Sequence, residues 1–218
     1  MRETLPAAMT YPFRDTVTSE AGLREIIGEP SELVLRKQLP ALDAHCRAFI
    51  ARSPFVLVGT ANRRGMCDVS PRGDAPGFVL VLDDRTLLIP DRPGNRRIDS
   101  FRNVLENPHV GLLFVIPGFE ETLRVNGRAR LVRDADLLAQ LAAKSKTPTI
   151  ALGVEVREAF LHCAKAFKRS ALWQSETWPE RGVLPSLGAM LQDQVRPEEM
   201  TAEQLDCQIE ESYVKRLY

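Results

Sequence analysis

The residues from 123 to 131 alternate between apolar or small side chains and polar side chains. The first set is Leu123, Val125, Gly127, Ala129 and Leu131, and the second is Arg124, Asn126, Arg128 and Arg130. Because successive side chains of a strand point to opposite faces, this period predicts a β-strand with one buried and one solvated face. Gly127 has no side chain to pack and indicates a bulge in that strand. A strand with one wet face is typical of an antiparallel sheet.

Five further runs of β-branched or aromatic residues predict strands, and turn signals separate them. They span residues 55–60, 78–82, 86–89, 110–116 and 150–156. Between the third and fourth runs of the chain, one amphipathic helix has Ile98, Phe101, Val104 and Leu105 on one face and ends at Asn107-Pro108. We therefore expect an antiparallel barrel that is crossed by one helix.

Other helices are predicted by caps and by apolar residues at helical spacing. They run from Ser19 to Gly28, from Pro40 to Ser53, from Asp134 to Lys144, from Ala164 to Trp173, and onward from Pro197. No repeat, low-complexity tract or long linker interrupts the chain, so a single domain is expected. Its parts would be a helical extension over 1–52, a barrel core over 53–160 and a helical segment over 161–218.

The bulk composition restricts the classes of partner. The 29 basic and 29 acidic residues balance, which argues against a global field that attracts nucleic acid or an anionic membrane. The four cysteines (Cys46, Cys67, Cys163 and Cys207) form no Cys-x-x-Cys pair, so we expect thiols rather than a zinc or redox motif. With no apolar leader at the N-terminus and no long apolar run, a cytoplasmic protein is expected.

The basic, turn-rich stretch from 70 to 108 predicts a phosphate site. Arg72, Arg92, Arg96 and Arg97 fall at the ends of predicted strands, where a folded sheet brings them together, and Asn95 is placed to cap the following helix. Guanidinium groups and the free N–H groups of a helix start both suit a phosphate dianion. Solvated surface charge is the competing interpretation of these arginines.

Four motifs in this region, PRGD, IPDRPGNRR, NPHVGLLF and ETLRVNGRARLV, resemble those of the pyridoxamine 5′-phosphate oxidase-like flavoproteins. The resemblance covers about residues 55–132, and HCAKAFKRSALW at 162–173 is similar to a narrower bacterial branch. It implies a six-stranded antiparallel split β-barrel that binds FMN. It also implies a homodimer, with each flavin at the interface between two barrels.

The resemblance implies particular contacts for the flavin. Phosphate and ribityl contacts fall to Arg72, Asn95, Arg96 and Arg97, with Asp91 and Arg92 beside the ribityl chain or the ring. The second subunit would present Glu121 and Thr122 to the flavin edge, and Lys165, Arg169 and Trp173 would close the ring side.

The resemblance further implies an FMN-dependent oxidoreductase that transfers hydride through the flavin N5 to or from a small molecule, with NADH or NADPH as a candidate donor. A C-terminal Arg-x-His segment of the vitamin B6 enzyme is missing, so turnover of pyridoxine phosphate is not expected.

Several alternatives stay open at this stage. The same barrel could bind or sense flavin without catalysis, or bind haem through His109 or His162. Asp74 and Asp91 suit either turn bracing or ligand contact. His162 and Cys163 are adjacent, which favours packing over a nucleophile pair because neighbours on a strand point apart. Trp173 suits interface packing as well as flavin stacking.

Overall fold

The computed structural model of the chain describes residues 12–196 and 200–218. The chain divides into two compact units, Met1–Lys37 and Gln38–Tyr218. The predicted start of the last helix at Pro197 lies outside the described residues.

The first unit contains helices α1 (Glu20–Ile27) and α2 (Glu32–Arg36). Ser19 caps α1 as predicted, because its side chain accepts a hydrogen bond from the backbone N–H of Gly22. The helix ends at Gly28, whose φ of 81° is one that glycine adopts without strain.

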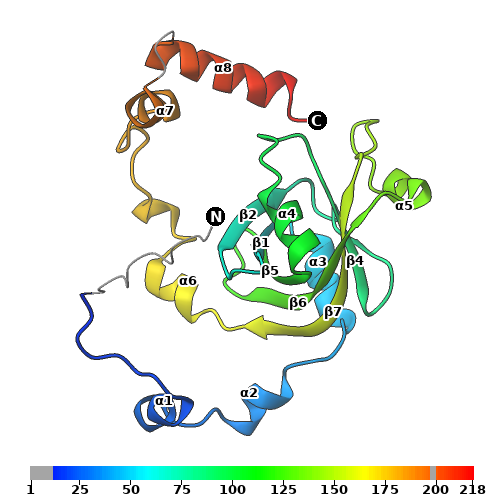
Figure 1. Cartoon of the computed structure of the whole chain (residues 1–218), viewed down its shortest axis with the longest axis vertical. Coiled ribbons are helices and arrows are strands. Elements are labelled where there is room, and N and C mark those ends of the chain that lie inside the picture. Colours follow the sequence, from blue (N-terminus) through cyan, green and yellow to red (C-terminus); the bar gives the residue numbers. More distant parts are fainter. Residues whose placement is uncertain (1–11, 197–199) are drawn as a thin grey trace, which may run out of the picture. The chain divides into compact units, whose positions relative to one another are not determined.

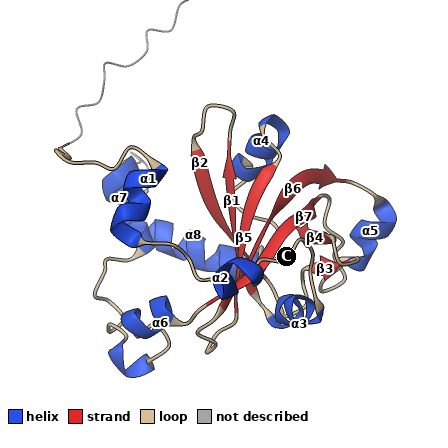
Figure 2. Ribbon diagram, turned by 90° about the horizontal axis from the view of Figure 1, so that it is seen from below, coloured by secondary structure: helices blue, strands red, loops and turns tan. Residues whose placement is uncertain are grey.

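The second unit is built on a seven-stranded sheet in which neighbouring strands are antiparallel (Figure 1). The order across the sheet is β2-β1-β5-β6-β7-β4-β3, and the strands fan apart in Figure 2. Their bounds are Phe55–Ala61 (β1), Cys67–Gly73 (β2), Leu80–Val81 (β3), Thr86–Pro90 (β4), His109–Val115 (β5), Thr122–Val132 (β6) and Ala151–His162 (β7). The predicted class, a mainly antiparallel β fold with peripheral helices, is confirmed.

The structure has seven strands rather than the six that were predicted. The additional strand is β2, which contains Pro71, Arg72 and Gly73 of the PRGD motif, in the stretch that the sequence suggested was turn-rich. Every residue of β2 is exposed or half-buried. Because the strand buries no side chain fully, its sequence shows no alternation of apolar and polar residues that would predict a strand. Pro71 has no backbone N–H to donate. It is tolerated in β2 because an edge strand has only one neighbouring strand, so its other side needs no hydrogen-bond donor.

The alternating run forms β6, which pairs with β5 on one side and β7 on the other. Leu123, Val125 and Ala129 are buried, and Arg128 is exposed, as the alternation predicted. The register shifts between Asn126 and Gly127, which confirms the predicted bulge. A Cβ atom at Gly127 would lie 2.3 Å from the carbonyl oxygen of Glu155, so the bulge requires glycine.

Helix α3 (Ala44–Arg52) packs its apolar side against the main core of the barrel. Leu42, Cys46 and Ile50 join that core together with buried strand residues such as Val58 and Phe114. A smaller cluster forms around α5 (Ala135–Gln140), where Leu138 and Leu141 are buried. Asp134 caps α5 as predicted, although this helix ends before the predicted Lys144.

Helix α4 (Asp99–Glu106) corrects two predictions. It begins at Asp99 rather than after an Asn95 cap, because its first position follows Ile98 in a left-handed conformation. Its buried residues are Ser100, Asn103 and Val104, whereas Leu105 is 73% exposed. The sequence predicted that the apolar side of α4 would be buried. Only part of that side is buried, because α4 packs on the strands largely through polar side chains.

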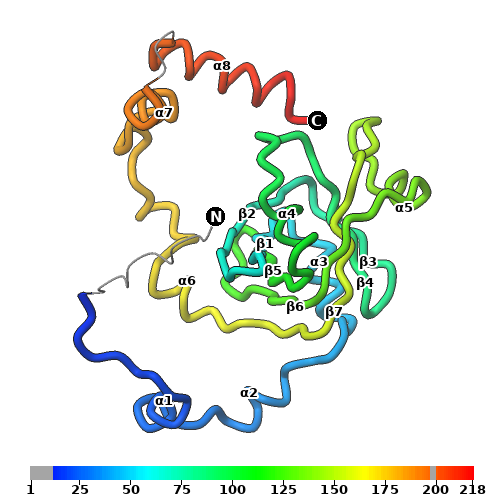
Figure 3. Tube along the Cα trace, viewed as in Figure 1, coloured from blue at the N-terminus to red at the C-terminus, as the bar shows by residue number. Residues whose placement is uncertain are grey.

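In the described part of the C-terminal segment, residues 161–196 and 200–218, there are three α-helices and a short 3-10 turn. Their bounds are Lys165–Ser170 (α6), Ser175–Thr177 (η1), Leu187–Val195 (α7) and Ala202–Lys215 (α8). Thr201 and Gln204 form a capping box at the start of α8. Among the described residues, no helix combines the length and apolar character that crossing a bilayer requires. In the trace of Figure 3, the end of α8 approaches the loop that precedes α4.

Candidate functional site

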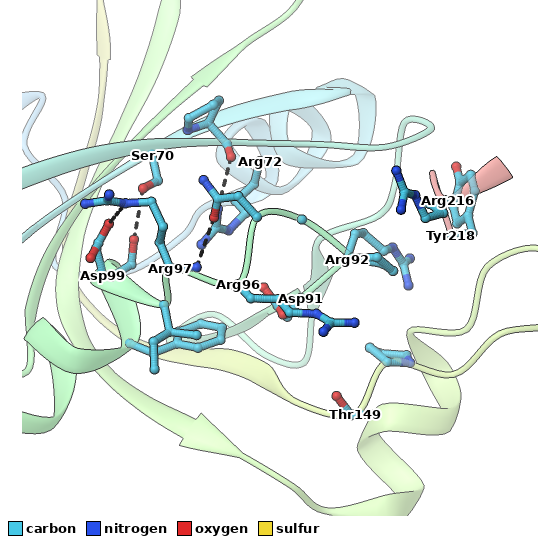
Figure 4. A pocket seen from close by; sticks show the side chains of 18 of the residues that line it. Ser70, Arg72, Asp91, Arg92, Arg96, Arg97, Asp99, Thr149, Arg216 and Tyr218 are labelled. Atoms are coloured by element: carbon cyan, nitrogen blue, oxygen red, sulfur yellow. Dashed lines mark hydrogen bonds and ion pairs between the residues drawn. The ribbon is translucent and has the colours of Figure 1, made fainter. Parts of the chain in front are cut away.

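A cavity of about 1010 Å³ opens where several segments of the second unit meet. Its walls are the end of β2, the loop between β4 and α4, the first turn of α4, residues 146–149, and the end of α8 with the residues after it. Figure 4 shows most of the side chains that line it. Arg92, from the loop between β4 and α4, lies on the same side of the cavity as Tyr218. Six cationic and two carboxylate side chains line the cavity, so its wall carries net positive charge.

The fold brings one group of predicted contacts to this cavity. The lining includes Arg72, Asp91, Arg92, Asn95, Arg96 and Arg97. The first of these comes from β2, and the others come from the loop that follows β4. Arg72 and the residues of the loop after β4 thus line the same cavity, although they are distant in sequence. The sequence predicted this proximity from their positions at the ends of predicted strands.

The arginines of the cavity differ in their ion pairs. The Nε atom of Arg92 lies 2.7 Å from Asp74, and that of Arg97 lies 2.8 Å from Asp99. By contrast, no ion pair to another described residue is found for Arg72, Arg96 or Arg216. Three guanidinium groups are therefore available to an anion in the cavity.

The loop before α4 holds an unusual backbone conformation. Arg96 and Ile98 have φ values of 59° and 56°, in the left-handed region that side chains other than glycine rarely adopt. The side-chain oxygen of Asn95 accepts a hydrogen bond from the backbone N–H of Arg97, so Asn95 braces the loop instead of capping the helix. Ile98 makes no side-chain cap, which leaves N–H groups at the start of α4 for another acceptor. Such strain is a feature of ligand-binding loops.

Polar contacts fix α4 against the strands. The Asn103 amide nitrogen donates hydrogen bonds to Thr60 Oγ1 at 3.0 Å and to Asp68 at 2.7 Å. The Ser100 hydroxyl donates to Ser70 Oγ at 3.1 Å, beside the cavity. These contacts set the rotation of α4 and therefore the position of its first turn. These contacts were not predicted from the sequence, although the spacing of Ser100 and Asn103 on one helical face was a usable signal.

Two carboxyl groups near the cavity have different environments. Burial raises the pKa of Asp91, and the nearby Arg72 opposes that rise in part. Burial also raises the pKa of Asp74, but hydrogen bonds from Tyr218, the backbone of Ala75 and Arg92 outweigh it, and the resulting pKa is lowered. Asp74 thus braces Arg92 as an ionised carboxylate at neutral pH.

The other predicted contacts do not line this cavity. Glu121 and Trp173 line a separate cavity of about 300 Å³ next to Phe119, and Thr122 is buried in β6. The indole N–H of Trp173 donates to the carbonyl of Phe119 at 2.8 Å, and its ring stacks on Phe167 with centroids 5.6 Å apart. Lys165 and Arg169 lie on α6 and line neither cavity. Within one chain, the fold therefore does not join these five residues to the arginines.

The candidates for other chemistries lie elsewhere. No group of three or more His, Cys, Asp or Glu side chains within residues 12–196 and 200–218 is arranged to hold a metal ion. His109 starts β5 and is exposed, while His162 ends β7 with its ring 4.9 Å from that of Phe160. Cys46 is buried, whereas Cys67, Cys163 and Cys207 are exposed.

A family model described as pyridoxamine 5′-phosphate oxidase matches residues 42–163, which include the sheet and the basic loop. A search of curated proteins found no relative.

Several solved structures are similar to this chain. One is a candidate pyridoxamine 5′-phosphate oxidase from Lactobacillus delbrueckii, 20% identical over 57% of this chain and 98% of that one, with a TM-score of 0.46. An FMN-binding protein from Syntrophomonas wolfei is 10% identical over 66% and 96%, with a TM-score of 0.41. HutZ, a haem storage protein from Vibrio cholerae, is 18% identical over 56% and 93%, with a TM-score of 0.39.

Proposed function

Because the chain belongs to the pyridoxamine 5′-phosphate oxidase family, we propose that it binds FMN in the arginine-lined cavity and acts as an oxidoreductase on a small molecule. The observation that carries the proposal is the set of guanidinium groups that form no ion pair with a described residue, those of Arg72 and Arg96 above all, in the lining of the cavity. A phosphate dianion is the ligand that such groups and free helix N–H groups bind best.

The donor set of the cavity fits the rest of that cofactor. Besides the arginines, the lining offers the hydroxyls of Ser70, Ser100, Thr147 and Thr149, which suit a ribityl chain. The cavity is also large enough for a ligand of this size, since small-molecule sites occupy about 300–1,000 Å³. Arg72, Arg96 and Arg97 would hold the phosphate, and Asp91 and Arg92 would lie nearer the ring.

The roles of this chain in the reaction are binding, orientation and charge. Bound FMN supplies hydride transfer at its N5 atom. Arg92, Lys165 and Arg169 are the candidates for the positive charge that would lie near the ring. We do not assign pyridoxine phosphate as substrate, since the sequence lacks the Arg-x-His segment of that enzyme.

A homodimer is part of the proposal. Glu121, Thr122, Lys165, Arg169 and Trp173 are proposed to reach the ring of a flavin held by a second copy. Exposed apolar side chains on β2, on α4 and in the loop between β5 and β6 support a subunit contact, because Val69, Leu105 and Phe119 are 67%, 73% and 55% exposed. Gel filtration with light scattering would give one peak at twice the mass of 24.4 kDa.

The first test is the absorbance spectrum and FMN affinity of the purified protein. Flavin bands are expected, and the Arg96→Ala, Arg97→Ala double variant should weaken FMN binding by about 100-fold or more, because two charge-assisted contacts are lost. Arg102→Ala, on α4 but outside the cavity lining, is the matched control and should bind as the parent does. A Soret band, or equal FMN affinity in the double variant, would contradict the proposal.

A second test separates an enzyme from a passive flavin binder. Anaerobic addition of NADH or NADPH should bleach the flavin bands if the protein is an oxidoreductase that takes electrons from these donors. Retained FMN that no donor and no small-molecule library reduces would favour the non-catalytic alternative.

A further inference from the structure

Tyr218 lies beside the cavity and joins three segments that are distant in sequence. Its hydroxyl donates a hydrogen bond to Asp74 Oδ1 at 2.6 Å, and its backbone carbonyl accepts one from Lys146 Nζ at 2.6 Å. Its ring centroid is 5.9 Å from the guanidinium carbon of Arg92 and 4.9 Å from the ammonium of Lys144. Both distances fall within the range of cation–π contact.

The carboxylate of Asp74 links the tyrosine to an arginine of the cavity. Its Oδ1 atom accepts hydrogen bonds from Tyr218 and from the backbone of Ala75, and its Oδ2 atom accepts one from Arg92 Nε at 2.7 Å. The Asp74 side chain is only 4% exposed, and that of Arg92 is 16% exposed. In a nearly dry site of this kind the carboxylate cannot rotate freely, so its partners fix one another.

The remaining nitrogens of Arg92 are the groups that face a ligand. Nε is used by Asp74, whereas neither terminal nitrogen has a hydrogen bond to another described residue. An arginine held through Nε presents its two terminal nitrogens in a fixed direction, which lowers the entropy lost when they bind an anion. Figure 4 shows Tyr218 and Arg216 at the edge of the cavity, on the side of Arg92.

We propose that Tyr218 is a positioning residue that orients Arg92 through Asp74 and thereby sets the affinity of the cavity for its anionic ligand. The inference rests on the proposed function for the identity of that ligand, FMN. It adds a role for the residues that follow α8, which the family resemblance did not assign to any residue of the chain.

The first experiment measures FMN affinity by quenching of flavin fluorescence. Tyr218→Phe keeps the ring but removes the hydroxyl, so the Kd should rise roughly three- to tenfold. Tyr213→Phe is the matched control, because Tyr213 lies on α8 five residues before Tyr218 and is 54% exposed, and its Kd should not change. An unchanged Kd in Tyr218→Phe would overturn the inference.

A double-mutant cycle tests whether the effect passes through Arg92. In an Arg92→Gln background, Tyr218→Phe should change the FMN Kd by less than about twofold, because the arginine that it positions is gone. If the two substitutions multiply independently, Tyr218 acts by another route and the inference fails. Equal melting temperatures of the variants would exclude loss of folding as the cause.

An ultraviolet difference titration of the protein without FMN is independent of the proposed function. The hydrogen bond to Asp74 raises the pKa of Tyr218 above its ordinary value. The titration of the parent minus that of Tyr218→Phe should therefore show a midpoint above about 10, and Asp74→Asn should lower it. A protein that binds no FMN but gives this titration would refute the proposed function alone. A midpoint at the ordinary value would refute the positioning role.

Discussion

Helices α3 and α4 both pack on the barrel, but they bury different chemistry. α3 buries Cys46 and Ile50 among apolar side chains, and this burial raises the pKa of the Cys46 thiol to about 11. α4 buries Ser100 and Asn103, whose side chains donate hydrogen bonds to the strands. Apolar burial does not depend on direction, whereas hydrogen bonds do.

The difference assigns separate tasks to the two helices. α3 contributes to the stability of the core, because its apolar side chains are removed from water. α4 contributes less apolar burial, but its directional contacts fix where its first turn lies, and that turn lines the cavity. The helix that carries part of the candidate site is therefore the one held by polar contacts.

The largest expected effect is on the apolar helix. Ile50 has 0% exposure, so Ile50→Ala should lower the free energy of unfolding by about 3 kcal/mol. The melting temperature should fall by roughly 6–12 °C in calorimetry. Ile26→Ala, at an isoleucine that is 71% exposed, is the control and should change little. A small effect at Ile50 would mean that α3 is not part of the core.

The next effect concerns the polar helix. Asn103→Ala leaves the buried Thr60 hydroxyl and Asp68 without their donor, so the free energy of unfolding should fall by about 2 kcal/mol. FMN affinity should fall as well, because the first turn of α4 loses its fixed rotation. Urea unfolding and flavin titration measure the two losses. Stability lost with FMN affinity intact would separate the polar contacts from the site.

A stabilising effect is expected at Ile98, where the loop joins α4. Its φ of 56° is strained for a β-branched residue, and glycine adopts this conformation readily. Ile98 is also 56% exposed, so little apolar burial is lost. Ile98→Gly should raise the free energy of unfolding by about 0.5–1 kcal/mol in urea. Ile98→Val retains the branched side chain and should give no gain, and a loss in Ile98→Gly would show that the strain is absent.

The smallest effect is expected at Leu105, which the hydrophobic period placed on the buried side of α4. Because Leu105 is 73% exposed, Leu105→Ala should change the free energy of unfolding by less than about 0.5 kcal/mol. Thermal unfolding of the monomeric form at low concentration is the relevant measurement. A decrease in the free energy of unfolding as large as that of Ile50→Ala would show that Leu105 is buried, as the sequence suggested.

Sequence patterns predicted the elements in which local chemistry and tertiary packing agree. The alternation of β6, the bulge at Gly127 and the caps at Ser19 and Asp134 all depend on residues within a few positions. The sequence patterns predicted neither the strand β2 nor the start of α4 at Asp99. The exposed edge strand β2 has no alternation of apolar and polar residues that would predict it. Helix α4 begins only at Asp99, because Ile98 before it has a left-handed backbone conformation.

The sequence by itself determined the antiparallel class, the family and the segment that carries the arginines, because these depend on local period and on motifs. Only the tertiary structure decided which arginines have acidic partners, which side of α4 is buried, and that Tyr218 contacts Asp74 across 144 positions. Such contacts depend on how distant segments pack in space, and no local spacing in the chain encodes that arrangement.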